Sequence, residues 1–156
     1  MLLVFLINAL VAALAVIIHY QALRLLTVQL PKLSIHPQLI VAFGVLGSMV
    51  AHLLEIWLFA VVYFLLLKAG GFGHLDGNFD GSLVACAYFS ISAYTSLGLG
   101  DIEPFGLVRF VTGMEALTGL LLITWSASFM FLEMQRYWNK SHSAGRPNHK
   151  EKDRDS

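Results

Sequence analysis

The chain has 156 residues, of which 57% are hydrophobic and 13% are charged. The surface of a soluble domain needs more charge than this, so the composition predicts a membrane protein. The formal net charge is zero, which gives no electrostatic reason to expect a nucleic-acid partner. Cys86 is the single cysteine, which excludes an intrachain disulfide framework and a cysteine-based metal site. We expect it to be a small buried apolar residue.

Three long apolar segments dominate the chain. They cover residues 2–23, 39–67 and 107–134, and each exceeds the roughly 20 residues that a helix needs to cross a bilayer. The first segment lacks the basic start and the cleavage pattern of a secretory signal peptide. We therefore read residues 1–23 as a retained N-terminal transmembrane helix, with a cleaved signal as the alternative. The prediction is an all-α membrane protein with three transmembrane helices.

The positions of the basic residues predict how these helices are oriented. Arg24 and Lys32 fall in the connection 24–38, and six further lysines and arginines fall in the tail 136–156. Cytoplasmic flanks of transmembrane helices carry an excess of such residues. We therefore expect the connection and the tail in the cytoplasm and the N-terminus outside. The tail is also polar and contains glycine and proline, so we expect it to be disordered.

A shorter apolar segment, residues 82–94, lies between the second and third long ones and follows a loop rich in glycine and aspartate, residues 70–81. Such a segment is too short to cross a bilayer as a helix. Irregular backbone is tolerated at membrane depth only where protein shields it or where it lines a water-filled path. The segment is therefore interpreted as a re-entrant pore helix that leads into a filter loop.

Residues 95–101 read Thr-Ser-Leu-Gly-Leu-Gly-Asp. The alternate glycines, Gly98 and Gly100, accept positive φ without steric cost, which lets consecutive backbone carbonyls face one axis. Two glycines at this spacing are also compatible with an ordinary flexible turn. The preceding short apolar helix and the two flanking spans supply the context that a filter motif requires, so the stretch is interpreted as an ion selectivity filter.

Residues 88–104 as a whole resemble the pore helix, filter and post-filter turn of the potassium channel family. The likeness is to the second pore loop of two-pore-domain potassium channels and to small bacterial channel proteins with one pore loop per chain. It covers about residues 39–135, the expected pore module, with an outer helix, the pore helix, the filter and an inner helix. The first span lies outside it.

The resemblance implies passive conduction of potassium by a homotetramer in the lipid bilayer, with no enzymatic activity, no cofactor and no nucleic-acid partner. It also implies a multi-pass protein of the bacterial inner membrane. Potassium would be held by the carbonyls of Ser96, Leu97, Gly98 and Leu99. The full set of ion-coordinating filter residues would be Thr95, Ser96, Leu97, Gly98, Leu99 and Gly100.

Two departures from the family pattern concern the support of the filter. Leu99 stands where the family has a tyrosine, and Phe89 stands where many members have a tryptophan. We expect Tyr88 or Ser92 to anchor Asp101 instead. Two alternatives therefore stay open: a weakly selective monovalent cation channel on the same scaffold, and a non-conducting channel-like interaction subunit. A membrane-embedded hydrolase is disfavoured, because its usual metal and nucleophile motifs are absent from the sequence.

Two features of the expected inner helix, an acidic residue and a pair of glycines, each allow two interpretations. Glu115 is an ionisable residue within a span, where it is costly unless it is paired or faces water. We expect it to brace the filter from behind by contacting Ser90, Ser92 or Tyr94, with a cavity-facing cation attractor as the alternative. Gly119 and Gly113 are candidates for a gating hinge or for close helix packing.

His52 and Glu55 form a polar pair within the second span. They are three residues apart and so share one face of a helix. The pair is either mutually satisfied or able to sense pH, because histidine exchanges its proton near neutral pH. As a metal site it supplies only two ligands where zinc needs three or four.

Overall fold

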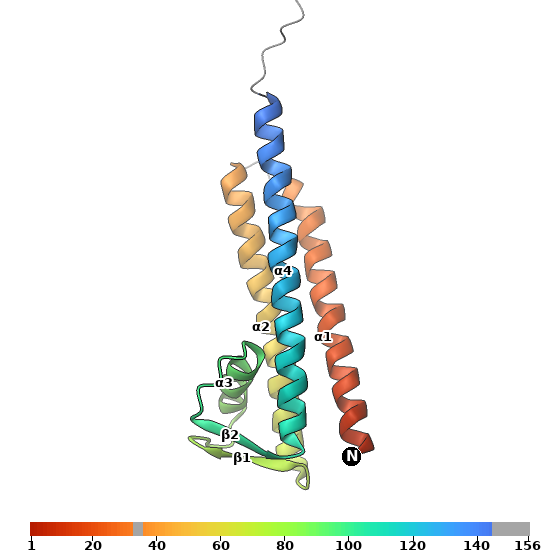
Figure 1. Cartoon of the computed structure of the whole chain (residues 1–156), viewed down its shortest axis with the longest axis vertical. Helices are drawn as coiled ribbons and strands as arrows, with labels where there is room; N and C mark the ends of the chain where they lie inside the picture. Colours follow the sequence, from red (N-terminus) through yellow and green to blue (C-terminus); the bar gives the residue numbers. More distant parts are fainter. Residues whose placement is uncertain (33–35, 145–156) are drawn as a thin grey trace, which may run out of the picture.

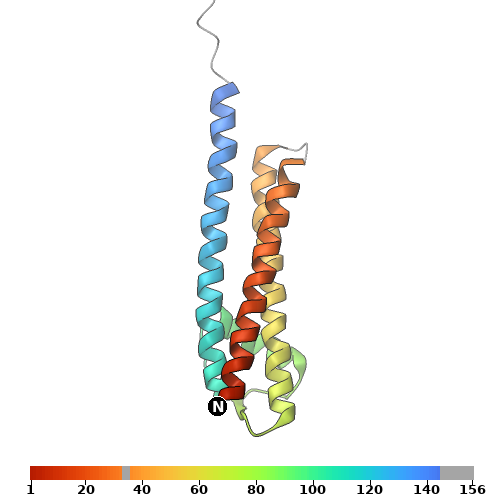
Figure 2. The same ribbon diagram turned by 90° about the vertical axis from the view of Figure 1, so that its right-hand side faces the viewer.

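The computed structural model describes residues 1–32 and 36–144 and is mostly helical. In chain order the elements are α1 (Leu2–Gln29), the short 3₁₀ helix η1 (Leu30–Lys32), α2 (Pro37–Ala69), β1 (Gly73–Gly77), α3 (Leu83–Tyr94), β2 (Ile102–Gly106) and α4 (Val108–Ala144). The long helices α1, α2 and α4 run side by side and contact one another, and α3 packs against α2 and α4 near one end of the bundle (Figure 1, Figure 2).

Three of these helices are long and apolar enough to cross a membrane. The candidate spans are Leu2–Lys32, Leu39–Ala69 and Val108–Arg136. Large apolar side chains on each of them are exposed, such as Leu6 on α1, Leu54 on α2 and Leu121 on α4. Side chains of this kind are stable on a surface that faces lipid or another chain. The expectation of a helical membrane protein with three long apolar helices is thus confirmed.

The first helix is longer than its apolar run predicted. We expected a connection from residue 24 to residue 38, whereas α1 continues to Gln29. Residues 24–29 contain neither proline nor glycine, and the first strong helix breaker is Pro31. Proline disfavours helical backbone in the residue before it, so the helix ends about there. The second helix begins with Pro37 at its first position, where the missing N–H costs nothing.

The last helix is also longer than expected. We predicted a disordered tail from residue 136, but α4 continues through Ala144. The physical reason is again the absence of a breaker: residues 136–144 contain no glycine or proline, which first occur at Gly145 and Pro147. Arg136 also donates a hydrogen bond to Glu133 at 2.8 Å, a favourable spacing on a helix. The rest of the predicted tail, residues 145–156, lies outside the described residues.

A two-stranded antiparallel sheet replaces part of the loop that we expected at residues 70–81. Strands β1 and β2 pair from Gly73 opposite Gly106 to Gly77 opposite Ile102. The sheet therefore ties the segment that enters α3 to the segment that follows residues 95–101. It lies at the same end of the bundle as the N-terminus and the start of α4 (Figure 1).

The two ends of the bundle differ in charge. The N-terminus, α3 and the sheet lie at one end, and the last turns of α1, the start of α2 and the last turns of α4 lie at the other (Figure 1, Figure 2). Arg24 and Lys32 belong to the second end, since they sit at the end of α1 and in η1. This distribution fits an orientation with the second end in the cytoplasm.

Candidate functional site

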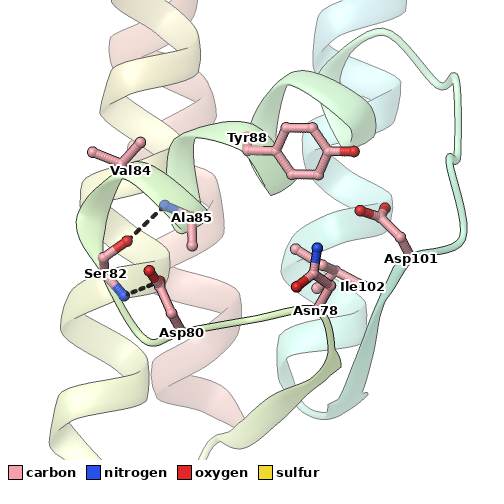
Figure 3. A pocket seen from close by; sticks show the side chains of 8 residues that line it. All are labelled: Asn78, Asp80, Ser82, Val84, Ala85, Tyr88, Asp101 and Ile102. Atoms are coloured by element: carbon pink, nitrogen blue, oxygen red, sulfur yellow. Dashed lines mark hydrogen bonds between the residues drawn. The ribbon is translucent and has the colours of Figure 1, made fainter.

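The start of α3 is fixed by side-chain caps. Ser82 is the N-cap residue, and its Oγ accepts a hydrogen bond from the Ala85 N–H at 3.0 Å. The Asp80 carboxylate in turn accepts a hydrogen bond from the Ser82 N–H at 2.9 Å (Figure 3). Hydrogen bonding to Ser82 lowers the pKa of Asp80 below its ordinary value. These caps satisfy N–H groups that a helix start leaves without partners.

The chain after α3 folds back so that three successive amides point at Ser92. The Leu97 N–H and the Gly98 N–H donate to the Ser92 carbonyl at 3.0 and 3.4 Å. The Leu99 N–H donates to the Ser92 Oγ at 3.1 Å. In a planar trans peptide the C=O points opposite to the N–H that follows it. The carbonyls of Ser96, Leu97 and Gly98 must therefore point away from α3, toward the open side of this segment.

The backbone of the same stretch alternates in φ. Ser96, Gly98 and Gly100 have φ values of 56°, 60° and 77°. Positive φ at the two glycines was expected, whereas Ser96 was not, because a residue with a Cβ rarely adopts it. A Cβ placed on Gly98 or on Gly100 would meet no atom within 4 Å. Glycine is therefore required here by backbone conformation and not by crowding within the chain.

Tyr88 and Ser92 divide the supporting role that we had expected of one of them. The Tyr88 hydroxyl points toward the Asp101 carboxylate (Figure 3), and this neighbouring carboxylate raises the pKa of Tyr88. Ser92 accepts hydrogen bonds from the backbone of residues 97–99 and not from Asp101. Phe89, the residue at the family's tryptophan position, packs edge-on against Tyr63 with ring centroids 5.1 Å apart, so it supports α3 from behind.

An open pocket of about 500 Å³ separates the start of α3 from β2. Its lining residues come from the loop before α3, from α3 itself, from the end of residues 95–101, which we call the filter stretch, and from the start of β2 (Figure 3). Two of them, Asp80 and Asp101, are acidic. The pocket therefore lies beside the filter stretch on the end of the bundle that carries the sheet.

Glu115 connects three helices from a fully buried position. Its Oε1 lies 2.5 Å from the Ser90 Oγ of α3, and its Oε2 accepts a hydrogen bond at 2.5 Å from the Tyr63 hydroxyl of α2. The Ser90 hydroxyl can donate only one hydrogen bond, and it also lies 2.9 Å from the Ile56 carbonyl. With a proton on Glu115, Glu115 would donate to Ser90, Ser90 to the Ile56 carbonyl and Tyr63 to Glu115, so that each of these groups would have a partner. Of the three partners that we considered, the structure brings Ser90 to Glu115.

Gly119 lies against the last residue of α3. A Cβ placed on Gly119 would be 2.2 Å from the Tyr94 carbonyl oxygen, far inside van der Waals contact. Gly113 is different, because a Cβ there would meet nothing within 4 Å. Gly119 therefore packs closely against a specific partner, whereas Gly113 has no such partner among the described residues. A hinge role for either glycine stays a prediction.

His52 and Glu55 belong to a larger buried cluster whose remaining members sequence reasoning missed. His19 of α1 places its Nδ1 2.9 Å from the Glu55 Oε1. The Tyr94 hydroxyl donates to the Glu55 Oε2 and lies 2.9 Å from the His52 Nδ1, which is itself 3.2 Å from that Glu55 oxygen. Ser126 of α4 places its Oγ 3.2 Å from the His19 Nε2. Four helices therefore meet in one polar cluster.

A signal for His19 was present in the sequence. It is a titratable residue in the middle of an apolar span, and such residues are costly in a membrane unless they have partners. Its partner Glu55 lies 36 positions further along the chain, so no local spacing links the two. The pH-sensing interpretation of His52 and Glu55 stays a prediction.

Comparison with known protein families identifies the class of protein. Residues 51–136, more than half of the chain, match the family model described as an ion channel. The chain therefore belongs to this ion channel family, whose members conduct ions passively through membranes. The match includes most of α2, all of α3 and the filter stretch, and it leaves α1 outside. Searches of curated proteins and of solved structures gave no match.

Proposed function

We propose that four copies of this chain form a pore that conducts potassium passively, with residues 95–101 as its selectivity filter. The observation that carries the proposal is the direction of the filter peptides. Three successive N–H groups bond Ser92, so the carbonyls of Ser96, Leu97 and Gly98 point to the opposite side. A row of inward-pointing backbone oxygens can replace the hydration shell of a potassium ion.

The remaining filter residues extend this row. Positive φ at Gly98 and Gly100 allows the Leu99 carbonyl to join the set, and the Thr95 side chain is held by its hydrogen bond to the Ile91 carbonyl at 2.7 Å. Asp101 closes the stretch beside Tyr88. In this arrangement α3 positions the filter backbone, and the ion contacts backbone oxygens and the Ser96 hydroxyl.

A homotetramer is proposed because one chain cannot surround an ion. The filter stretch is open in the single chain, with Leu97 and Leu99 both more than half exposed, at 65% and 52%. A single row of carbonyls covers one side of an ion. Closed rotational symmetry of identical chains supplies the other sides and covers exposed apolar faces at the same time. The proposed pore lies on that axis and α4 lines its inner cavity.

The weakly selective channel is the second candidate, and one observation favours it. Leu99 has no hydroxyl, and Phe89 packs against Tyr63, away from the filter. The filter backbone therefore relies on Ser92 and on the contact between Tyr88 and Asp101.

We further propose that the N-terminus lies outside, that the protein has no cofactor and no enzymatic activity, and that it resides in a bacterial inner membrane. The resemblance to small bacterial channels supports the last of these points.

Two measurements on purified protein test the proposal. Native mass spectrometry should give the mass of four chains, and proteoliposomes should take up potassium faster than sodium. Ser92→Ala, which removes the acceptor of the Leu99 N–H, should reduce the preference for potassium. Ser128→Ala is the matched control, because Ser128 is exposed and its hydroxyl donates to the Thr124 carbonyl of the same helix. A dimer, or a Ser92→Ala variant with unchanged preference, would contradict the proposal.

A further inference from the structure

The cluster between α1 and α2 has the geometry of a metal site. His19, His52 and Glu55 each offer one ligand atom, and these atoms all lie within 4.8 Å of one another. The two closest approaches are 2.9 Å from His19 Nδ1 to Glu55 Oε1 and 3.2 Å from His52 Nδ1 to Glu55 Oε2. Tetrahedral zinc with bonds of about 2.0 Å needs ligand atoms about 3.3 Å apart, so small side-chain rotations reach that arrangement.

We propose that His19, His52 and Glu55 bind a divalent transition-metal ion of the zinc class at the junction of α1 and α2. Two imidazoles and one carboxylate are a donor set that suits zinc and its neighbours in the first transition row. Magnesium and calcium prefer all-oxygen sites. The site goes beyond the conducting pore, because one of its ligands lies on α1, outside the residues that match the ion channel family.

The second nitrogen of His19 already has a partner that orients the ring. The Ser126 Oγ lies 3.2 Å from the His19 Nε2, which leaves the Nδ1 facing Glu55. Histidines that bind metal commonly use their other ring nitrogen in such a hydrogen bond, which fixes the ring and its tautomer. The His19 ring also packs against the rings of His52 and Trp125, with centroids 5.0 and 5.4 Å away. The ligand is therefore pre-oriented.

The burial of Glu55 gives a reason for a cation here. Its side chain is fully buried, and within the described part of the chain its ion-pair partners are the two histidines. A carboxylate buried between apolar helices is costly unless a positive charge lies beside it. A bound divalent cation supplies the missing charge. His52 is 17% exposed, so the site has one side through which an ion can enter.

The Tyr94 hydroxyl lies beside the three proposed ligands, where a fourth ligand would be needed. Its hydroxyl lies 2.9 Å from the His52 Nδ1 and donates to Glu55. On binding, this hydroxyl or a water completes the tetrahedron, and the hydrogen bonds among the ligands are exchanged for metal bonds. Tyr94 is the last residue of α3 and directly precedes the filter stretch. If the proposed pore is correct, metal binding therefore acts beside the filter.

Cobalt binding to the full-length protein in detergent tests the site without any measurement of conduction. The affinity tag is removed first, because polyhistidine binds the same ions. Titration with Co²⁺ should give one ion per chain with the strong visible absorption of four-coordinate cobalt, and Zn²⁺ should displace it. His19→Ala and His52→Ala should abolish that absorption. Ser126→Ala should weaken binding by about 10–100-fold, as loss of an orienting hydrogen bond does.

His74→Ala is the matched control, because His74 lies exposed on β1, remote from the cluster in sequence, and the variant should bind as the unchanged protein does. Cobalt binding to the protein without substitutions tests the proposed site even if a variant of the cluster fails to fold. Absence of saturable Co²⁺ and Zn²⁺ binding, or six-coordinate absorption alone, would overturn the proposal. So would binding that survives His19→Ala. A chain that binds one cobalt but passes no potassium would retain this site and lose the proposed function.

Discussion

Replacing Gly119 by alanine tests how closely α4 packs against α3. The new Cβ would lie 2.2 Å from the Tyr94 carbonyl oxygen and 2.9 Å from two further Tyr94 atoms. Real Cβ atoms essentially never come closer than 3.0 Å to such neighbours, so the contact must open by at least about 0.8 Å, the difference between the two distances. Backbone cannot rotate aside as a flexible side chain does, so α3 and α4 must separate.

Overpacking of this kind costs about 1–3 kcal/mol. We expect Gly119→Ala to unfold at lower denaturant in a detergent titration and to lose potassium flux, because Tyr94 directly precedes the filter stretch. Gly113→Ala is the control on the same helix. It meets nothing within 4 Å and gains about 1 kcal/mol of helix propensity, so its stability should be equal or higher. A Gly119→Ala protein as stable and as active as the unchanged protein would refute the packing account.

Three further predictions concern the filter and the buried carboxyl behind it. Gly98→Ala and Gly100→Ala should insert normally but lose selective conduction, because alanine at their positive φ costs about 1–2 kcal/mol each; unchanged selectivity in flux assays would contradict the filter assignment. Tyr88→Phe, which removes the hydroxyl that faces Asp101, should lower the preference for potassium over sodium in liposomes, and an unchanged ratio would exclude a supporting role. Glu115→Ala should destabilise the bundle by about 0.5–1.5 kcal/mol for each of the hydrogen bonds to Ser90 and Tyr63 that it removes, whereas an unchanged unfolding midpoint would exclude the brace.

The sequence predicted the helices better than their ends. An apolar run marks the part of a helix that avoids water, and the three apolar runs correctly located the three long helices. The run carries no information about where helical backbone stops, because polar residues continue a helix until a breaker occurs. Thus α1 continues past Arg24 to Gln29, and α4 continues past Arg136 to Ala144.

The filter stretch shows a similar division between local and distant causes. Glycine spacing was enough to predict positive φ at Gly98 and Gly100. Positive φ at Ser96 was not predictable locally, because the conformation is held by bonds from the following amides to Ser92. The pairing of β1 with β2 was also missed, since the two strands are short and lie on either side of α3.

The cluster around Glu55 was the hardest part to predict. Its members come from four helices, and only His52 lies at helical spacing from Glu55. Polar residues in the first span were the available clue. The His19 side chain has hydrogen-bond partners on α2 and α4, whereas the buried Asn8 side chain has none among the described residues. A single polar residue in a span therefore indicates that a partner is needed but not which residue provides it.

The reversal potential of the purified protein in a planar bilayer decides whether residues 95–101 form a potassium filter. With concentrated potassium on one side, dilute potassium on the other and sodium balancing the total salt, the current should reverse near the potassium equilibrium potential. Gly100→Ala should abolish that selective current. A reversal potential at zero would show a non-selective pore, and it would contradict the claim.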